Sequence, residues 1–233
     1  MKKITFIIVL AIVMAACVKT PEPTRFSILG DSYSTYEGYV HPDSNLVFPY
    51  DEIGVTGVEQ MWWSHVADSM DWLLERNNSF SGSLICNMNA SNYYGPYSFI
   101  RRMNNLGNPD VIFILGGTND VWNDAPFGDY VYSDWTEEQL CSYRPALAYL
   151  LDNMKRLYPK AKLYFVLETD PCPGGITEET QLNLVRSTHR VANHYNVDCI
   201  DLFDIHKKWW HPDVQGQREI ADQVLEFLAT EKL

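Results

Sequence analysis

The amino-acid sequence predicts a three-layer α/β/α fold with a central, mostly parallel sheet of five strands. Two observations support this prediction. Short apolar runs alternate with segments of helical periodicity along nearly the whole chain, and each apolar run is followed by polar or glycine residues. Strands that are apolar on both faces are typical of parallel sheets covered by helices. Ligands in such sheets bind beyond the carboxyl ends of the strands.

Residues 1–16 have the features of a secretory signal, because two lysines precede an apolar run over residues 4–16 that is too short to span a bilayer as a helix. The run ends in Met-Ala-Ala and is followed at once by Cys17, as in the signals of bacterial lipoproteins. We therefore expect an exported protein that is anchored in a bacterial cell envelope through a lipid on Cys17. Residues 17–24 would be the tether and 25–233 one domain. The alternative is an ordinary signal peptide, with the cysteine as a passenger.

Five short runs after the tether are mostly apolar and are predicted as buried strands. They are Phe26–Leu29, Leu84–Asn87, Val111–Leu115, Lys162–Leu167 and Cys199–Leu202. Cys86 and Cys199 lie inside such runs, where cysteine usually acts as a small apolar side chain. The chain has no Cys-x-x-Cys pair, so the sequence does not indicate a structural zinc site.

Segments of helical periodicity lie between and after these runs. They are Val58–Arg76, Ser98–Leu106, Thr136–Tyr158, Thr177–His194 and Gln215–Thr230. The third opens with Thr-Glu-Glu-Gln, a capping box, and Asp213 is placed to cap the last. This alternation predicts right-handed crossovers with helices on both faces of the sheet. Two long aromatic connections, 33–57 and 121–136, follow predicted strands, and long connections at the binding edge are more often functional than decorative.

The charge balance argues against a nucleic-acid partner. The chain carries 18 basic and 30 acidic residues, a formal net charge of −12. A surface of this sign repels phosphate backbones and anionic headgroups. A membrane contact is therefore expected only through the lipid anchor.

Three short motifs place reactive groups after predicted strands or before the last helix. Ser32 follows the first strand in the sequence Gly-Asp-Ser, where a turn with a serine cap is the alternative to a nucleophile. Asn119 follows the third strand in Gly-Gly-Thr-Asn-Asp and can donate two side-chain hydrogens to a developing oxyanion. His211 stands before Pro212 at the last helix. The other five histidines are expected to be structural, and neither a Gly-x-Ser-x-Gly elbow nor a Walker loop is present.

These three motifs, in this order, resemble those of the SGNH (GDSL-type) hydrolase family over roughly residues 25–228. The resemblance implies a flavodoxin-like three-layer fold and a serine hydrolase that cleaves acyl esters. It implies Ser32 as the nucleophile and His211 as its general base and then the acid for the leaving alcohol. The oxyanion hole would use the Asn119 side chain and the Ser32 backbone N–H. No metal or cofactor is implied.

The second motif of that family departs from the usual pattern in this chain. The family has a glycine after the second strand, whereas here the best match to that position is Asn92. The oxyanion donor there is a backbone N–H, which any residue except proline can supply, and asparagine tolerates left-handed φ well. The alternative is a local rearrangement that brings Gly95 to the position.

A second departure concerns the residue that orients His211. The family has aspartate three positions before the histidine, whereas this chain has Lys208, which cannot accept a hydrogen bond from the imidazole. Three outcomes are open. Asp204 or Asp201 takes over the role, a backbone carbonyl orients the ring in a Ser-His dyad, or catalysis is lost. A dyad or a replacement carboxylate, with Asp204 the first choice, is favoured over inactivity because triad members act through geometry rather than through fixed sequence positions.

Aromatic residues cluster near the expected site, and Tyr33, Trp122 and Trp210 are assigned to substrate binding. Aromatic rings stack on sugars and acyl chains alike, and a hydrophobic cluster beneath the long loops is an equal alternative. Export and family analogy favour an esterase that removes a short acyl group, acetyl, from a carbohydrate, either a small molecule or a polysaccharide. The alternatives are a lysophospholipase or thioesterase, and a glycan-binding lipoprotein that has kept the fold without catalysis.

Overall fold

A central sheet of five parallel strands, in the order β2-β1-β3-β4-β5, organises the protein. The strands are β1 (Arg25–Gly30), β2 (Leu73–Asn77), β3 (Val111–Leu115), β4 (Lys162–Glu168) and β5 (Asp198–Leu202). This computed structural model describes residues 22–40, 45, 47, 51–88, 95–170 and 176–231. The expectations for residues 1–16, Cys17 and Asn92 lie outside the described residues. The predicted α/β fold with a parallel five-stranded sheet is confirmed.

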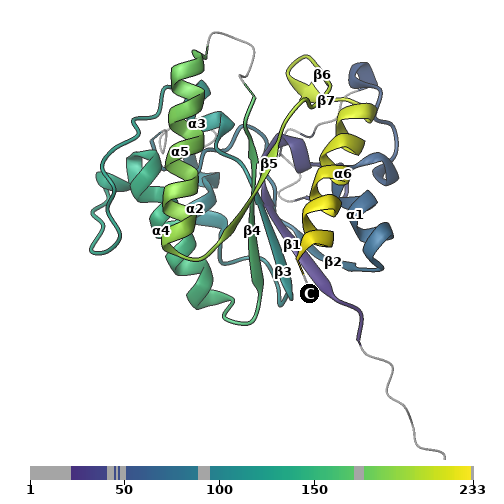
Figure 1. Cartoon of the computed structure of the whole chain (residues 1–233), viewed down its shortest axis with the longest axis horizontal. Helices are drawn as coiled ribbons and strands as arrows, with labels where there is room; N and C mark the ends of the chain where they lie inside the picture. The colour runs from purple at the N-terminus through teal and green to yellow at the C-terminus, as the bar shows by residue number, and fades with distance from the viewer. Residues whose placement is uncertain are drawn as a thin grey trace, which may run out of the picture.

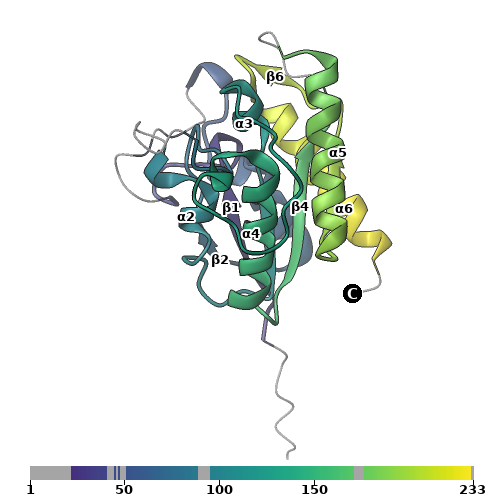
Figure 2. The same ribbon diagram turned by 90° about the vertical axis from the view of Figure 1, so that its left-hand side faces the viewer.

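Helices cover both faces of the sheet (Figure 1). On one face lie α1 (Trp62–Met70) and α6 (Val214–Thr230), and on the other lie α2 (Phe99–Arg102), α4 (Tyr143–Leu157) and α5 (Glu178–His194). Figure 2 shows the same arrangement from the side of α4 and α5. Among the described residues, no helix is long and apolar enough to cross a membrane.

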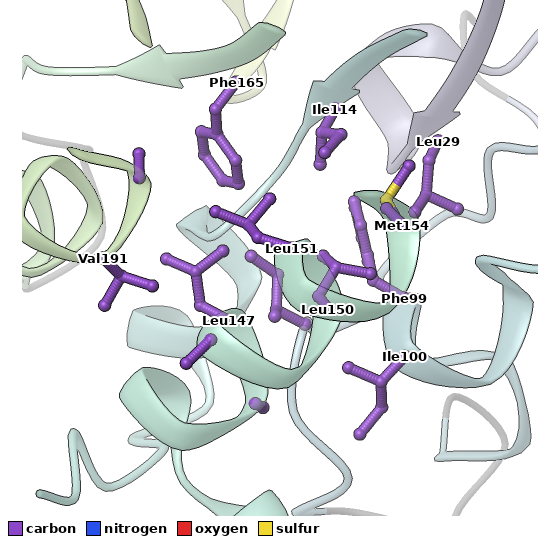
Figure 3. Packing of buried hydrophobic residues seen from close by; sticks show 14 of the residues in the cluster. Leu29, Phe99, Ile100, Ile114, Leu147, Leu150, Leu151, Met154, Phe165 and Val191 are labelled. Atoms are coloured by element: carbon purple, nitrogen blue, oxygen red, sulfur yellow. The ribbon is translucent and has the colours of Figure 1, made fainter. Parts of the chain in front are cut away.

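The strands fill both helical layers because alternate side chains point to opposite faces. In β3, Ile112 and Ile114 belong to the core under α4 and α5, whereas Val111, Phe113 and Leu115 belong to the core under α1 and α6. Figure 3 shows Ile114 and Phe165 meeting leucines of α4. Strands β1, β3 and β4 are therefore mostly apolar, and the apolar residues of β5 lie in its second half, which is why the sequence revealed these strands.

The second strand was placed wrongly by the sequence analysis. The predicted helix Val58–Arg76 is α1 followed by β2, because Asp71 adopts a left-handed backbone (φ 55°) that ends the helix. Leu73 to Asn77 then pair in parallel with β1 at the edge of the sheet. Because β2 is exposed and reads Leu-Leu-Glu-Arg-Asn, it lacks the apolar signature of a buried strand.

The run Leu84–Asn87 is buried but is not a strand. Leu84, Ile85 and Cys86 are each at most 2% exposed, as their apolar character predicts. However, the Ile85 and Cys86 amides donate to the carboxylate of Asp120, at 2.9 and 3.1 Å, instead of to a neighbouring strand. A buried carboxylate thus satisfies backbone groups that a sheet would otherwise satisfy.

The predicted helices differ from the observed helices mainly in where they begin and end. The capping box at Thr136 forms, with reciprocal hydrogen bonds to Gln139, but it opens a short 3-10 turn (Gln139–Cys141), and α4 begins only at Tyr143. The predicted helix Ser98–Leu106 is reduced to α2. Thr177 and Asp213 cap α5 and α6 through side-chain hydrogen bonds to Thr180 and Gly216.

Two small elements at the carboxyl edge of the sheet were not predicted. They are α3 (Thr118–Trp122) and an antiparallel hairpin formed by β6 (Lys207–Lys208) and β7 (His211–Pro212). Figure 1 shows both at the end of the sheet opposite the end where the chain enters β1. They bring Asn119 and His211 to the edge where β1 delivers Ser32.

Candidate active site

Ser32 begins a 3-10 turn (Ser32–Ser34) directly after β1, and it is 8% exposed. Asp31 caps this turn, since its Oδ1 accepts a hydrogen bond from the Tyr33 amide at 3.1 Å. Gly30 is required by close packing, because a Cβ there would lie 2.6 Å from Oγ of Ser79. The hydroxyl of Ser32 is therefore fixed at the rim of the sheet by its two preceding residues.

His211 lies beside this hydroxyl, with its Nε2 at 2.9 Å from Oγ of Ser32. Its Nδ1 lies 3.1 Å from the carbonyl oxygen of Trp209. A carbonyl can only accept, so Nδ1 carries the proton and Nε2 presents its lone pair to the serine. Burial lowers the pKa of His211 and the charge of Lys207 lowers it further, against the opposing effect of the Trp209 carbonyl. The lowered pKa favours the neutral imidazole, the form that a general base requires.

The two carboxylates proposed to orient His211 receive no support from the structure. Asp204 is exposed in a left-handed conformation (φ 54°), and its backbone N–H donates to the carboxylate of Asp170. The carboxylate of Asp201 accepts from Nε2 of His189 at 2.9 Å. Nδ1 of His211 is instead bonded to the Trp209 carbonyl. Of the three outcomes that the sequence left open, the geometry matches the one in which a backbone carbonyl orients the ring.

The hairpin that supplies this carbonyl has a strained turn. Lys208 pairs with His211, and the two residues between them, Trp209 and Trp210, both have positive φ (51° and 66°). Two-residue turns of this kind favour asparagine and glycine. For other residues, left-handed backbone costs roughly 1–2 kcal/mol each. Such strain persists where surrounding contacts enforce it, and it concentrates at functional sites.

Asn119 reaches the same place from the first turn of α3. Its Nδ2 lies 3.3 Å from Oδ2 of Asp31, which leaves its second amide hydrogen for another acceptor. Gly117 before the helix has a φ of 107°, which a residue with a side chain rarely adopts. Burial raises the pKa of Asp31 to about 7, against the hydrogen bond from Tyr33 and the charge of Arg102.

Asn92 cannot be placed because it lies outside the described residues, but both flanks of its segment are described. Gly95, the alternative, begins a 3-10 turn (Gly95–Tyr97). On the other flank, Asp120 holds the amides of Ile85 and Cys86. Burial raises the pKa of Asp120 to about 6, although these amides lower it. Asp120 is an anchoring residue that the sequence analysis missed, although it ends the Gly-Gly-Thr-Asn-Asp motif.

The three aromatic residues assigned to substrate binding surround Ser32. The Tyr33 hydroxyl donates to the carbonyl of Trp210 at 2.9 Å, and its ring packs edge-on against His211 with centroids 5.6 Å apart. Trp122 and Trp210 meet edge-to-face at 5.5 Å. Together with Asp31, Thr118, Asn119 and the dyad, these three line a hollow of about 30 Å³.

A larger groove of about 460 Å³ shares Trp122 and Trp210 with this hollow. Its other lining residues mix polar and apolar groups and come from the end of α3 and the start of α5: Val121, Asp124, Ile176, Thr177 and Thr180. Its volume lies in the range of small-molecule sites. Within the described ranges, no group of three or more His, Cys, Asp or Glu residues is arranged to hold a metal ion.

Comparisons with known proteins show the family of the chain and similar solved structures. A family model described as "GDSL-like Lipase/Acylhydrolase" matches residues 24–228. A candidate GDSL-like lipase from Bacteroides ovatus is 44% identical, with a TM-score of 0.81, and the match covers 91% of this chain and 100% of that chain. One from Bacteroides uniformis is 41% identical, with a TM-score of 0.78 and coverage of 90% and 97%.

A more distant match shows the fold alone. A family two carbohydrate esterase from Clostridium thermocellum, solved with cellohexaose, is 18% identical, with a TM-score of 0.55 and coverage of 89% of this chain and 65% of that chain. A search of curated proteins found no match.

Proposed function

Since the chain belongs to the GDSL-like lipase/acylhydrolase family, we propose that it is a serine esterase in which Ser32 and His211 form a catalytic dyad. One observation carries the proposal, the 2.9 Å separation between Oγ of Ser32 and Nε2 of His211. A serine hydroxyl is a poor nucleophile until a neighbouring base accepts its proton, and this base is within hydrogen-bond reach.

The reaction follows from this geometry. Oγ of Ser32 attacks the ester carbonyl while its proton passes to Nε2 of His211, and Nδ1–H stays bonded to the Trp209 carbonyl. The oxyanion accepts hydrogen bonds from the Ser32 backbone N–H and the second Nδ2 hydrogen of Asn119. The third donor that the sequence assigns, the backbone N–H of Asn92, lies outside the described residues. His211 then returns the proton to the leaving alcohol. Water, activated by the same imidazole, hydrolyses the acyl-enzyme.

The substrate proposed is a short acyl ester, acetyl, on a carbohydrate. The hollow of about 30 Å³ at Ser32 is too small for a long acyl chain, which favours a short acyl group. The adjacent groove combines indole surfaces with the hydroxyls of Thr177 and Thr180, which suits a neutral sugar better than an acyl chain. A net charge of −12 further disfavours an anionic lipid surface as substrate.

The experiment compares p-nitrophenyl acetate with long-chain p-nitrophenyl esters and acetylated oligosaccharides. We expect hydrolysis of acetate esters and labelling by a fluorophosphonate, both lost in Ser32→Ala. Ser133→Ala, which removes an exposed serine hydroxyl, is the matched control. Equal activity of the Ser32→Ala variant and the unchanged protein would refute the mechanism. A preference for long acyl chains would favour a lysophospholipase or thioesterase.

A glycan-binding protein without catalysis is the second candidate. It is favoured by the exposure of Trp209 (71%), Trp210 (46%) and Trp122 (38%) around the site, since exposed indoles form sugar-binding surfaces. Tight oligosaccharide binding without fluorophosphonate labelling would select it.

We also propose export and lipid anchoring through Cys17, on the sequence evidence of residues 1–17. Cys17→Ser is expected to release the protein from the membrane fraction and to abolish labelling by a fatty-acid probe. Unchanged fractionation and labelling would contradict the anchor.

A further inference from the structure

The hairpin that carries His211 is fastened to the sheet by a buried ion pair. Glu168 is the last residue of β4, and its Oε1 bonds to Nζ of Lys207, the first residue of β6. The side chains of Glu168 and Lys207 are 3% and 12% exposed. Breaking a pair this deeply buried leaves an uncompensated charge, so its geometry is far more constrained than that of a surface pair.

Tyr33 joins this pair to the dyad. Its hydroxyl donates to the carbonyl of Trp210, and it also lies close enough to Glu168 to lower the pKa of that carboxyl. The ammonium of Lys207 lies 6.0 Å from the centre of the Tyr33 ring, and this ring packs against His211. Glu168 therefore contacts the hairpin through Lys207 and the turn after β1 through Tyr33.

The strained turn consists of Trp209 and Trp210, and the carbonyl of each accepts a hydrogen bond from a side chain of the candidate site. The Trp209 carbonyl binds His211, and the Trp210 carbonyl binds Tyr33. A left-handed Trp-Trp pair relaxes unless its surroundings hold it. The contacts that hold it join the turn to β4 and to the residue after Ser32.

We infer that Glu168 and Lys207 are positioning residues, which hold the strained turn so that the Trp209 carbonyl orients His211 in place of a triad carboxylate. The inference rests on the proposed function for its kinetic consequence. Its structural part, the orientation of the His211 ring, stands independently of turnover.

The test uses Lys207→Met, Glu168→Gln and Lys207→Arg in the full-length chain, with hydrolysis of p-nitrophenyl acetate as the assay. Lys207→Met is expected to lower kcat about 10- to 100-fold with KM changed much less, because misplacing a catalytic group costs rate rather than binding. Lys207→Arg keeps the charge and the bond to Glu168 and is expected to recover most of kcat. Arg218→Met, which breaks an exposed pair on α6, is the matched control and should leave kcat unchanged.

A second measurement separates positioning from loss of stability. The pKa of His211, followed by NMR of its ring protons, is expected to rise in Lys207→Met, because the ammonium lowers it. It should fall in Glu168→Gln, which leaves that ammonium uncompensated. A general loosening of the fold would shift the pKa of His211 in the same direction in Lys207→Met and in Glu168→Gln. Circular dichroism confirms that each variant is folded.

The outcomes are distinguishable from those of the proposed function. If Ser32→Ala is as active as the unchanged protein, the esterase proposal fails, while the two opposite pKa shifts still support the positioning role. If kcat is unchanged and the His211 pKa does not move in folded Lys207→Met and Glu168→Gln, the positioning role is overturned. A loss of kcat of the same size in Arg218→Met would overturn it equally.

Discussion

The carbonyl oxygen of Trp209 lies 3.1 Å from Nδ1 of His211, two residues further along the same hairpin. This contact keeps the outer nitrogen of the ring protonated and directs the lone pair of Nε2 to Ser32. A carbonyl dipole stabilises an imidazolium less than a full carboxylate charge does. The proposed reaction therefore depends strongly on the geometry of the hairpin.

Introducing an aspartate at the family position should bring little gain. In Lys208→Asp, kcat is expected to change by less than about tenfold, because Nδ1 is already bonded and the new carboxylate would lie near Asp213, which Lys208 now approaches at 3.9 Å. The measurement is kcat for p-nitrophenyl acetate, with Lys208→Asn as the uncharged control. A hundredfold rise confined to the aspartate variant would mean that the Trp209 carbonyl orients the ring poorly.

Removing the side-chain oxyanion donor should reduce the rate of acylation. Asn119→Ala is expected to lower kcat by about 10²–10³ with KM nearly unchanged, as loss of one such donor does elsewhere. Asn104→Ala, which removes an exposed amide in the turn after α2, is the matched control. Retention of full activity in Asn119→Ala would exclude Asn119 from the oxyanion hole.

The pH profile should reflect the buried imidazole. Burial lowers the pKa of His211, so kcat/KM is expected to rise with pH along an acid limb centred below the usual histidine value of 6.5. Asp31, whose pKa burial raises to about 7, titrates nearby. An NMR titration of the His211 ring protons shows whether the acid limb of the kcat/KM profile follows the ionisation of His211 or that of Asp31. An acid limb centred above 6.5 that follows the His211 signals would contradict the lowered pKa of this imidazole.

Asp120 should contribute to stability through the two amides it binds. Asp120→Asn replaces one acceptor oxygen with an amide donor, so the free energy of unfolding is expected to fall by about 1–3 kcal/mol, as urea denaturation measures. Asp68→Asn on the exposed side of α1 is the control.

The same variant tests a pH dependence. Because burial raises the pKa of Asp120 to about 6, the folded state binds its proton more tightly than the unfolded state does. The pKa of this carboxyl is near 3.9 in the unfolded chain and about 6 in the folded protein. The protonated carboxyl therefore contributes fully to the free energy of unfolding below about pH 4, and this contribution is lost as the pH rises through about 6. In Asp120→Asn, the free energy of unfolding should no longer change with pH between about 4 and 6 because of this group. If the variant and the unchanged protein show the same pH dependence, other groups are responsible for it.

Trp122 should matter for sugar esters and not for a minimal ester. Trp122→Ala is expected to raise KM for acetylated oligosaccharides about three- to tenfold, the effect of losing one aromatic contact. KM for p-nitrophenyl acetate should change less, since that ester contacts Trp122 only in the hollow at Ser32 and does not reach the groove. Leu157→Ala, an exposed residue at the end of α4, is the control. Equal changes for both substrates would argue against a role in sugar binding.

The sequence was most informative for strands that are buried on both faces and for residues that belong to a motif. Four of the five strands were predicted from their apolar runs, although β5 also carries two aspartates, and the motifs pointed to Ser32 and His211, which the structure brings together. The edge strand β2 was missed because a half-exposed strand resembles one turn of an amphipathic helix. The partner of Nδ1 is a main-chain group, which no residue type reveals. Glu168 and Lys207 meet only through the fold, since 39 positions separate them.

The two reactive side chains stand 179 positions apart along the chain. A growing polypeptide therefore carries Ser32 long before it acquires His211. Fragments that end before the last hairpin cannot attack cellular esters through this dyad. Under the proposed mechanism, hydrolysis requires that these two distant segments have folded together, so an activity assay would report on their docking.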